Sequence, residues 1–131
     1  MVEKRPEQKK KQITYSEYEK IIEVLIKKTK KVFEKELNSK KINGVYGLPR
    51  GGLPIAVQFS HHLELPLFIT PKEGCLIVDD ISDSGKALKE FSGKYPIVTI
   101  FCKEKSITIP NVYYKLVTEK DWIVFPWEKE W

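Results

Sequence analysis

Apolar residues in the first third of the chain recur at the three- and four-residue spacing of an amphipathic helix. They are Tyr18, Ile21, Ile22, Leu25, Thr29, Val32 and Phe33. Such spacing packs one face of a helix against a core. Thr14 and Ser16 are each followed three residues later by a glutamate, which is the pattern of a capping box. We therefore expect the helix to begin at one of these two residues, with an exit loop at residues 38–41.

Beyond this helix, short apolar runs alternate with helical patterns. Strands are predicted at residues 42–48, 65–70, 75–79, 97–102 and 112–117, and helices at residues 53–63 and 84–91. The run at 75–79 shows no alternation of apolar and polar residues, which is typical of a strand covered on both faces. The order predicts an α/β fold with three layers, in which a mostly parallel sheet carries helices on both faces.

The length of 131 residues predicts one domain, and the 41% hydrophobic and 31% charged fractions are ordinary for a globular protein. Residues 1–12 are polar and charged, so we expect a disordered basic tail there and a single domain over residues 13–131. No apolar run approaches a membrane span, and the first residues lack the apolar core of a signal peptide. A cytoplasmic protein is expected.

The two cysteines, Cys75 and Cys102, lie in apolar runs far apart in the sequence, and we expect buried reduced thiols. The formal charge of +5 suggests a polyanionic ligand. Much of it comes from the tail and from the polar face of the first helix, without the interleaved aromatics that bind single strands. Nucleic-acid binding is therefore kept only as an alternative.

One segment combines a buried strand with acids and a small-residue loop. Residues 75–78 are apolar, Asp79 and Asp80 follow, and Ile-Ser-Asp-Ser-Gly-Lys leads into the predicted helix. A strand–loop–helix junction gathers backbone N–H groups at one point, which favours a phosphate. Two acids beside a phosphate repel it unless they bind ribose hydroxyls or Mg²⁺. The alternative is that the acids only cap the following helix. The glycines and lysine of this segment do not have the spacing of a Walker phosphate-binding loop.

The stretch Leu-Ile-Val-Asp-Asp-Ile-Ser-Asp-Ser-Gly-Lys-Ala at residues 76–87 resembles the phosphoribosyl pyrophosphate (PRPP) motif of type I phosphoribosyltransferases. The resemblance implies that Asp79 and Asp80 hold the ribose hydroxyls and Mg²⁺. It makes Asp83 the candidate general base facing the purine N7. The implied PRPP-binding residues are Arg50, Gly51, Gly52, Asp79, Asp80, Asp83, Ser84, Gly85, Lys86 and Ala87. Lys86 departs from the small residue usual there and either adds charge to the phosphate site or points to solvent.

A second segment, Gly47-Leu-Pro-Arg-Gly-Gly-Leu53, is similar to the pyrophosphate loop of that family. Its glycines let backbone N–H groups face an anion, and Arg50 offers a planar fork that suits phosphate oxygens. Taken alone, the segment is a plain strand-to-helix turn with an exposed arginine. Its order and spacing relative to the PRPP motif favour the functional interpretation.

Residues 97–103 and 121–128 resemble the bacterial xanthine–guanine branch of the family. This resemblance places Lys103 against the purine O6, Trp122 on the ring, and Ile123 and Glu128 at the edge that bears N1 and N2. The alternative is that Lys103 is a surface lysine and Trp122 an ordinary aromatic. Phe125 and Trp127 are interpreted as core or dimer aromatics.

The resemblance implies a purine phosphoribosyltransferase that uses Mg²⁺, transfers phosphoribose to a 6-oxopurine, and assembles as a dimer or higher homo-oligomer. Its implied catalytic residues are Arg50, Asp83 and Lys103. Type I enzymes carry a long flexible loop before the PRPP strand, but here only residues 71–74 separate the two predicted strands, which predicts that this lid is missing. A PRPP- or nucleotide-binding protein with little or no transferase activity therefore remains the main alternative.

Overall fold

The computed structural model describes residues 8–128. The elements in chain order are β1 (Lys9–Gln12), α1 (Tyr15–Val32), α2 (Glu34–Asn38), β2 (Gly44–Gly47), α3 (Gly52–Leu63), β3 (Leu67–Phe68), β4 (Cys75–Ser82), α4 (Lys86–Lys89), β5 (Ile97–Lys103), β6 (Val112–Val117) and β7 (Asp121–Val124). Five of the strands form a sheet in the order β3-β2-β4-β5-β6, and all of its neighbours are parallel.

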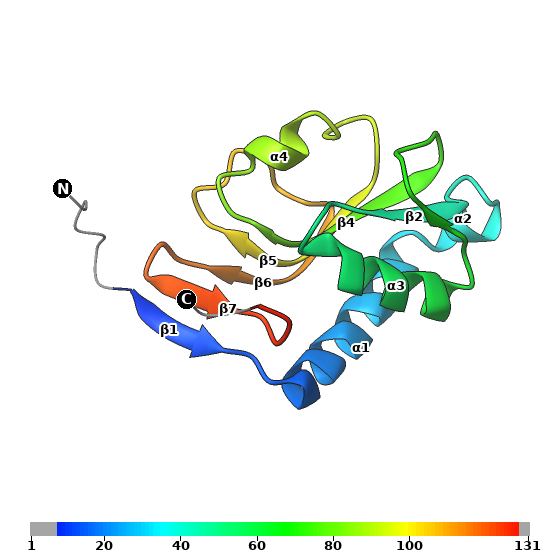
Figure 1. Cartoon of the computed structure of the whole chain (residues 1–131). Helices are drawn as coiled ribbons and strands as arrows, with labels where there is room; N and C mark the ends of the chain where they lie inside the picture. Colours follow the sequence, from blue (N-terminus) through cyan, green and yellow to red (C-terminus); the bar gives the residue numbers. More distant parts are fainter. Residues whose placement is uncertain (1–7, 129–131) are drawn as a thin grey trace.

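Helices cover both faces of this sheet, with α1 and α3 on one side and α4 on the other (Figure 1). The α/β fold with a parallel sheet in the middle layer is therefore confirmed. Because every crossover in a parallel sheet returns the chain to the same end, the carboxyl ends of β2, β4 and β5 meet at one edge. No helix within residues 8–128 is long and apolar enough to cross a membrane.

Helix α1 begins as predicted at the first of the two candidate caps. The Thr14 hydroxyl accepts a hydrogen bond from the Glu17 amide, and the Glu17 carboxylate accepts one from the Thr14 amide. This capping box satisfies amide groups that the first helical turn leaves without partners. The sequence predicted a loop at residues 38–41 directly after this helix. In the structure α1 ends at Val32, and a second short helix, α2, runs from Glu34 to Asn38 before the loop.

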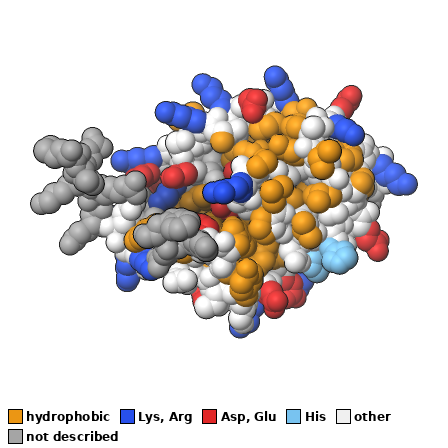
Figure 2. Space-filling model, in the orientation of Figure 1, with side chains coloured by type: hydrophobic (Ala, Val, Ile, Leu, Met, Phe, Trp, Pro, Cys, Tyr) orange, Lys and Arg blue, Asp and Glu red, His pale blue; other side chains and the backbone are white. Residues whose placement is uncertain are grey.

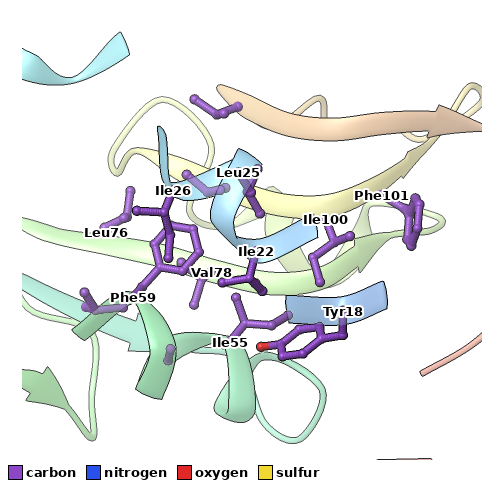
Figure 3. Close-up of a cluster of buried hydrophobic side chains, with 14 of the residues drawn as sticks. Tyr18, Ile22, Leu25, Ile26, Ile55, Phe59, Leu76, Val78, Ile100 and Phe101 are labelled. Atoms are coloured by element: carbon purple, nitrogen blue, oxygen red, sulfur yellow. The ribbon is translucent and has the colours of Figure 1, made fainter. Parts of the chain in front are cut away.

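The larger core lies between α1, α3 and the sheet (Figure 3). The apolar face predicted for α1 contributes Tyr18, Ile22 and Leu25, joined by Ile26, which the prediction left out, and helix α3 adds Ile55 and Phe59. Val32, which the prediction placed on this face, is exposed. These side chains pack on Leu76, Val78, Ile100 and Phe101 of the central strands. Central strands β4 and β5 are thus covered on this face along most of their length, which holds their carboxyl ends in fixed positions.

A smaller core fills the opposite face. It consists of Cys75 and Ile77 from β4, Ile97 from β5, and Leu88 and Phe91 from the segment around α4. Both cysteines of the chain are buried and free, which confirms the expectation of reduced thiols. The helix expected over residues 84–91 is much shorter than predicted, because residues 83–85 form an irregular loop and the chain turns again after Lys89.

Strands β1 and β7 form a separate parallel pair that the sequence did not predict. The prediction of a disordered tail is wrong for residues 9–12, and residues 1–7 lie outside the described residues. Ile13, the residue after β1, anchors this strand. Its side chain is buried in the larger core, and its amide donates to the Val124 carbonyl at 2.9 Å. Backbone pairing fixes strand β1 although its side chains are exposed, so no apolar pattern marks it.

Other element bounds also differ from the prediction, and the largest differences are in β3 and β4. Strand β3 is shorter than expected, and strand β4 extends through both acids to Ser82. This extension arises because Ile81 and Ser82 still pair with Phe101 and Cys102 of β5. The acids are therefore held on a paired strand rather than on a loop.

Candidate functional site

A cleft of about 840 Å³ opens at the carboxyl ends of β2, β4 and β5. Eight of the residues singled out from the sequence line it: Arg50, Gly51, Asp80, Asp83, Lys103, Trp122, Ile123 and Glu128. Six others lie beside these in the chain without lining the cleft: Gly52, Asp79, Ser84, Gly85, Lys86 and Ala87. Segments separated by most of the chain thus converge where ligands of open parallel sheets bind.

The two acids at the end of β4 are half-buried and face each other's charge. The Oδ1 atom of Asp79 accepts from the Asp80 amide at 2.9 Å, and Oδ1 of Asp80 accepts from the Ile81 amide at 2.8 Å. Burial raises the pKa of Asp79 well above its ordinary value, and the neighbouring Asp80 charge adds to this. Burial also raises the pKa of Asp80. Such a pair is costly to ionise without a cation or hydroxyl partners.

The loop at residues 48–52 closes against Asp80. It is tied to the sheet by the Leu48 amide, which donates to the Val78 carbonyl at 3.0 Å. Gly51 faces the Asp80 carboxylate so closely that an added Cβ atom would collide with it. Arg50 is exposed at the tip of the loop, beside the cleft. The loop and the acids therefore form one wall, with a guanidinium and carboxylates on neighbouring positions.

The small-residue loop after β4 lies next to this wall. Gly85 is buried in the left-handed conformation with φ of +84°, whereas Ser84, Lys86 and Ala87 are exposed. The Ser84 hydroxyl accepts from the Lys86 amide at 3.3 Å. Exposure of the Lys86 side chain agrees with the alternative in which it points to solvent.

Lys103 is the last residue of β5 and is only 5% exposed, so the interpretation as a surface lysine is wrong. Its Nζ atom donates to the carbonyl oxygens of Asp121 at 2.7 Å and Thr118 at 2.9 Å. An ammonium group has three N–H donors, so one remains to face the cleft that Lys103 lines. This donor suits a carbonyl oxygen of a planar ligand.

The turn that holds the Lys103 ammonium is itself braced. The Asp121 carboxylate accepts from the Thr118 amide at 2.8 Å and lies 2.9 Å from the Lys11 ammonium of β1. These contacts, the backbone one foremost, lower the pKa of Asp121 to about 2. Strand β1 therefore supports the turn whose carbonyls position Lys103.

Aromatic side chains form the opposite wall of the cleft. Trp122 is 46% exposed and has the Lys10 ammonium 5.7 Å from its ring centroid. Phe125 is buried in the larger core, as expected, and stacks on Trp127 with ring centroids 5.1 Å apart. The Glu128 carboxylate accepts from the Phe125 amide at 3.2 Å, and burial raises its pKa. The wall thus offers an indole face and an acid near the cleft.

Sequence reasoning missed four residues that line the cleft, namely Gln8, Ile81, Glu119 and Asp121, and it missed the ion pair of Asp121 with Lys11. The Gln8 side chain donates to the Glu119 carbonyl at 3.2 Å, which ties the start of the described chain to the turn. The only signal in the sequence was the spacing of Thr118 and Asp121, which suits a side-chain-stabilised turn. Nothing in the sequence pointed from the lysine-rich tail to that turn.

The donor set at the end of β4 fits Mg²⁺. Magnesium prefers oxygen ligands and in nucleotide sites commonly takes one or two carboxylates together with phosphate oxygens. Asp79 and Asp80 supply two neighbouring carboxylates, and burial raises the pKa of each, so a bound cation would offset the cost of their charge. No cluster of three or more metal-binding side chains occurs within residues 8–128, so water and the oxygens of a ligand would supply the rest of the shell.

Opposite pKa shifts predict opposite effects of two matched substitutions. The pKa of Asp79 is higher in the folded protein than in the unfolded chain, so the folded protein must hold or lose a proton that the unfolded chain has already released. Asp79 therefore lowers the free energy of unfolding as pH rises from about 4. Asp121 behaves oppositely: its contribution is present above about pH 4 and is lost as pH falls toward 2. In EDTA at pH 8, Asp79→Asn should raise Tm by about 3 °C or more, and Asp121→Asn should lower it slightly. Thermal unfolding from pH 5 to 8 checks this, and equal Tm changes in both variants would contradict it.

The sequence is similar to xanthine-guanine phosphoribosyltransferases of two bacteria. It is 38% identical over 58 residues to the enzyme of Roseobacter denitrificans and to that of Cereibacter sphaeroides. The match takes in 42% of this chain and spans about a third of the length of these curated relatives. No family model matches the sequence.

Solved structures resemble this chain over nearly its whole length. The purine phosphoribosyltransferase of Pyrococcus horikoshii is 26% identical, with a TM-score of 0.69 over 92% of this chain and 95% of the other. The xanthine-guanine-hypoxanthine phosphoribosyltransferase of Helicobacter pylori is 19% identical, with a TM-score of 0.76 over 92% and 93% of the two chains. The chain therefore has the fold of these enzymes, and in sequence it resembles xanthine-guanine phosphoribosyltransferases.

Proposed function

Since this chain resembles type I purine phosphoribosyltransferases in sequence and in fold, we propose that it transfers phosphoribose from PRPP to a 6-oxopurine in purine salvage. The base would be guanine, xanthine or hypoxanthine, and the products the nucleotide and pyrophosphate. One observation carries the proposal: Arg50, Asp80 and Lys103, from three different strand ends, line the same cleft.

On the PRPP side, Asp79 and Asp80 would bind the ribose hydroxyls and Mg²⁺. When bound, Mg²⁺ would neutralise pyrophosphate oxygens and so assist their departure. Arg50 would hold the pyrophosphate with its planar fork, together with the backbone of Gly51 and Gly52. The loop of residues 84–87 would receive the 5′-phosphate with its backbone N–H groups.

On the base side, Lys103 would donate to O6, and Trp122 would stack on the purine ring. The Ile123 backbone and the Glu128 carboxylate would accept from the ring edge that bears N1 and N2. Asp83 would receive the proton displaced from the ring nitrogen as that nitrogen attacks C1 of the ribose. The bond from C1 to pyrophosphate breaks through a state with positive charge on the ribose, so the carboxylates assist by position and charge.

The test of the proposal is direct. With Mg²⁺, PRPP and guanine, xanthine or hypoxanthine in turn, the protein should release one pyrophosphate for each nucleotide formed, and chromatography can count both. Release of pyrophosphate without nucleotide would mean hydrolysis of PRPP. No release with any base would contradict the transferase proposal.

The second candidate is a protein that binds PRPP or nucleotides with little or no transfer. The short connection between β3 and β4 favours this candidate. It comprises only residues 69–74, and the prediction that the flexible lid is missing rests on its length. Binding of Mg-PRPP by calorimetry, without product from any base, would support this candidate. Nucleic-acid binding is the third; salt-sensitive retention on nucleic acid without PRPP binding would support it.

The family resemblance extends the proposal to a cytoplasmic homo-oligomer of two or more subunits. Figure 2 shows a band of hydrophobic side chains on the face that carries α3. Helix α3 exposes Leu53 and Val57, and the edge strand β3 exposes Leu67, followed by Ile69, which is 89% exposed. A patch of this kind supports association between subunits. Light scattering of the purified protein would measure the oligomer.

A further inference from the structure

A cluster of buried hydroxyl groups lies directly beneath the small-residue loop that follows β4. It consists of Ser82 at the end of β4 and of Ser106 and Thr108 in the connection between β5 and β6. The Ser82 hydroxyl donates to the Thr108 carbonyl at 2.7 Å and lies 2.8 Å from the Ser106 hydroxyl. These three residues form the hydroxyl shelf, which joins two segments that are not neighbours in the sequence.

The hydroxyl shelf binds the carbonyl groups of the loop above it. The Thr108 hydroxyl donates to the Gly85 carbonyl at 2.6 Å, and the Ile107 amide donates to the Ser84 carbonyl at 3.0 Å. A Cβ atom at Gly85 would lie 2.5 Å from both the Ser106 hydroxyl and the Thr108 amide. Contact this close leaves no room for the loop to shift toward the shelf.

The hydrogen bonds to the Ser84 and Gly85 carbonyls also fix the orientation of the N–H groups in the same peptide units. Carbonyl and N–H of a peptide unit point in opposite directions, so carbonyls held toward the shelf turn the following amides away from it. These following amides belong to Gly85 and Lys86. Among residues 8–128, the Gly85 amide donates no hydrogen bond, and the Lys86 amide donates to the Ser84 hydroxyl at 3.3 Å. Buried polar groups that are fully bonded give such a loop a single conformation.

We propose that Thr108, assisted by Ser106, is a positioning residue for the 5′-phosphate: it holds the loop of residues 84–87 in the shape that binds this group. The inference rests on the proposed function, because it assigns a role within the proposed PRPP site. Neither residue contacts the cleft, and neither lies in the segments that resemble the family's motifs.

The test compares Thr108→Val with Thr29→Val. Both threonines are buried and both hydroxyls donate to a backbone carbonyl, but Thr29 does so to Leu25 within α1, at 2.8 Å. By calorimetry, Thr108→Val should weaken Mg-PRPP binding about tenfold, the size of one lost hydrogen bond. Its affinity for Mg-pyrophosphate, which has no 5′-phosphate, should stay within about twofold of wild type. Thr29→Val should bind both as wild type does, and Thr108→Ser should restore Mg-PRPP binding.

Each result decides between the proposals. Failure of the wild-type protein to bind Mg-PRPP would overturn the proposed function, whatever the variants do. Wild-type binding with an unchanged Thr108→Val would overturn the positioning role alone, as would an equal loss of pyrophosphate affinity. If Thr108→Val is insoluble, Ser106→Ala takes its place, because it removes contacts to Ser82 and Thr108; it too should weaken Mg-PRPP binding selectively.

Discussion

Replacing Asp80 by asparagine should lower kcat/KM for PRPP by about 100-fold or more, because the variant keeps the shape of the side chain and loses its charge. Asp80 lies on a paired strand and faces Gly51 of the loop proposed to hold pyrophosphate. Asparagine can still accept a hydrogen bond, but it is a poor ligand for Mg²⁺. Steady-state kinetics of pyrophosphate release, with Mg-PRPP calorimetry beside it, would measure the effect.

Loss of folding should not explain this result. Burial raises the pKa of Asp80, so its charge costs stability in the ligand-free protein and asparagine should relieve that cost. Glu23→Gln provides the control. Glu23 is exposed on α1, and its substitution removes one negative charge away from the residues that line the cleft. A KM for PRPP within twofold of wild type in Asp80→Asn would remove the role assigned to Asp80.

Replacing Lys103 by methionine should lower kcat/KM for the purine base by about 100-fold to 1,000-fold, comparable to removing a key donor from an active site. The reason is that Lys103 is a buried ammonium that lines the cleft and keeps one donor beyond the two bonded to carbonyl oxygens. Binding of Mg-PRPP should remain within about twofold of wild type, because PRPP carries no oxo group for Lys103 to bind. Kinetics at saturating PRPP and calorimetry of Mg-PRPP separate the two effects.

Methionine also leaves the carbonyls of Thr118 and Asp121 without their donor, so a lower Tm is expected and the kinetics must be measured well below it. Lys115→Met is the matched control, since Lys115 is exposed on the adjacent strand β6. An equal loss of PRPP affinity in Lys103→Met would indicate a general collapse of the site rather than a role in base binding.

The central sheet and the acids at its edge could be predicted because local sequence specifies them. The apolar run of β4 has both faces buried and ends in two acids, which leaves few alternatives to a parallel strand with a site at its end. The capping box of α1 likewise depends only on residues three positions apart. In both cases the determining contacts are close in sequence or repeat with a fixed period.

The remaining parts depend on contacts between distant segments, which no local pattern reveals. Strand β1 is lysine-rich and exposed, and only its pairing with β7 orders it. The burial of Lys103 depends on the carbonyl groups of Thr118 and Asp121, in a turn that follows β6 in the sequence. The hydroxyl shelf joins Ser82 to Thr108, and serine and threonine in a connecting segment ordinarily indicate only a turn.

The pairing of β1 with β7 has a consequence for the order in which the two halves of the cleft can form. The bond from Gln8 to Glu119 joins residues 111 positions apart, so it closes a loop that contains nearly all the rest of the fold. During synthesis strand β2, which leads into the loop of Arg50, can pair with β4, which carries Asp80, before residues 118–124 exist. The ion pair of Lys11 with Asp121 cannot form until then. We therefore expect a tag fused directly before Gln8 to disturb the purine side of the cleft more than the phosphate side.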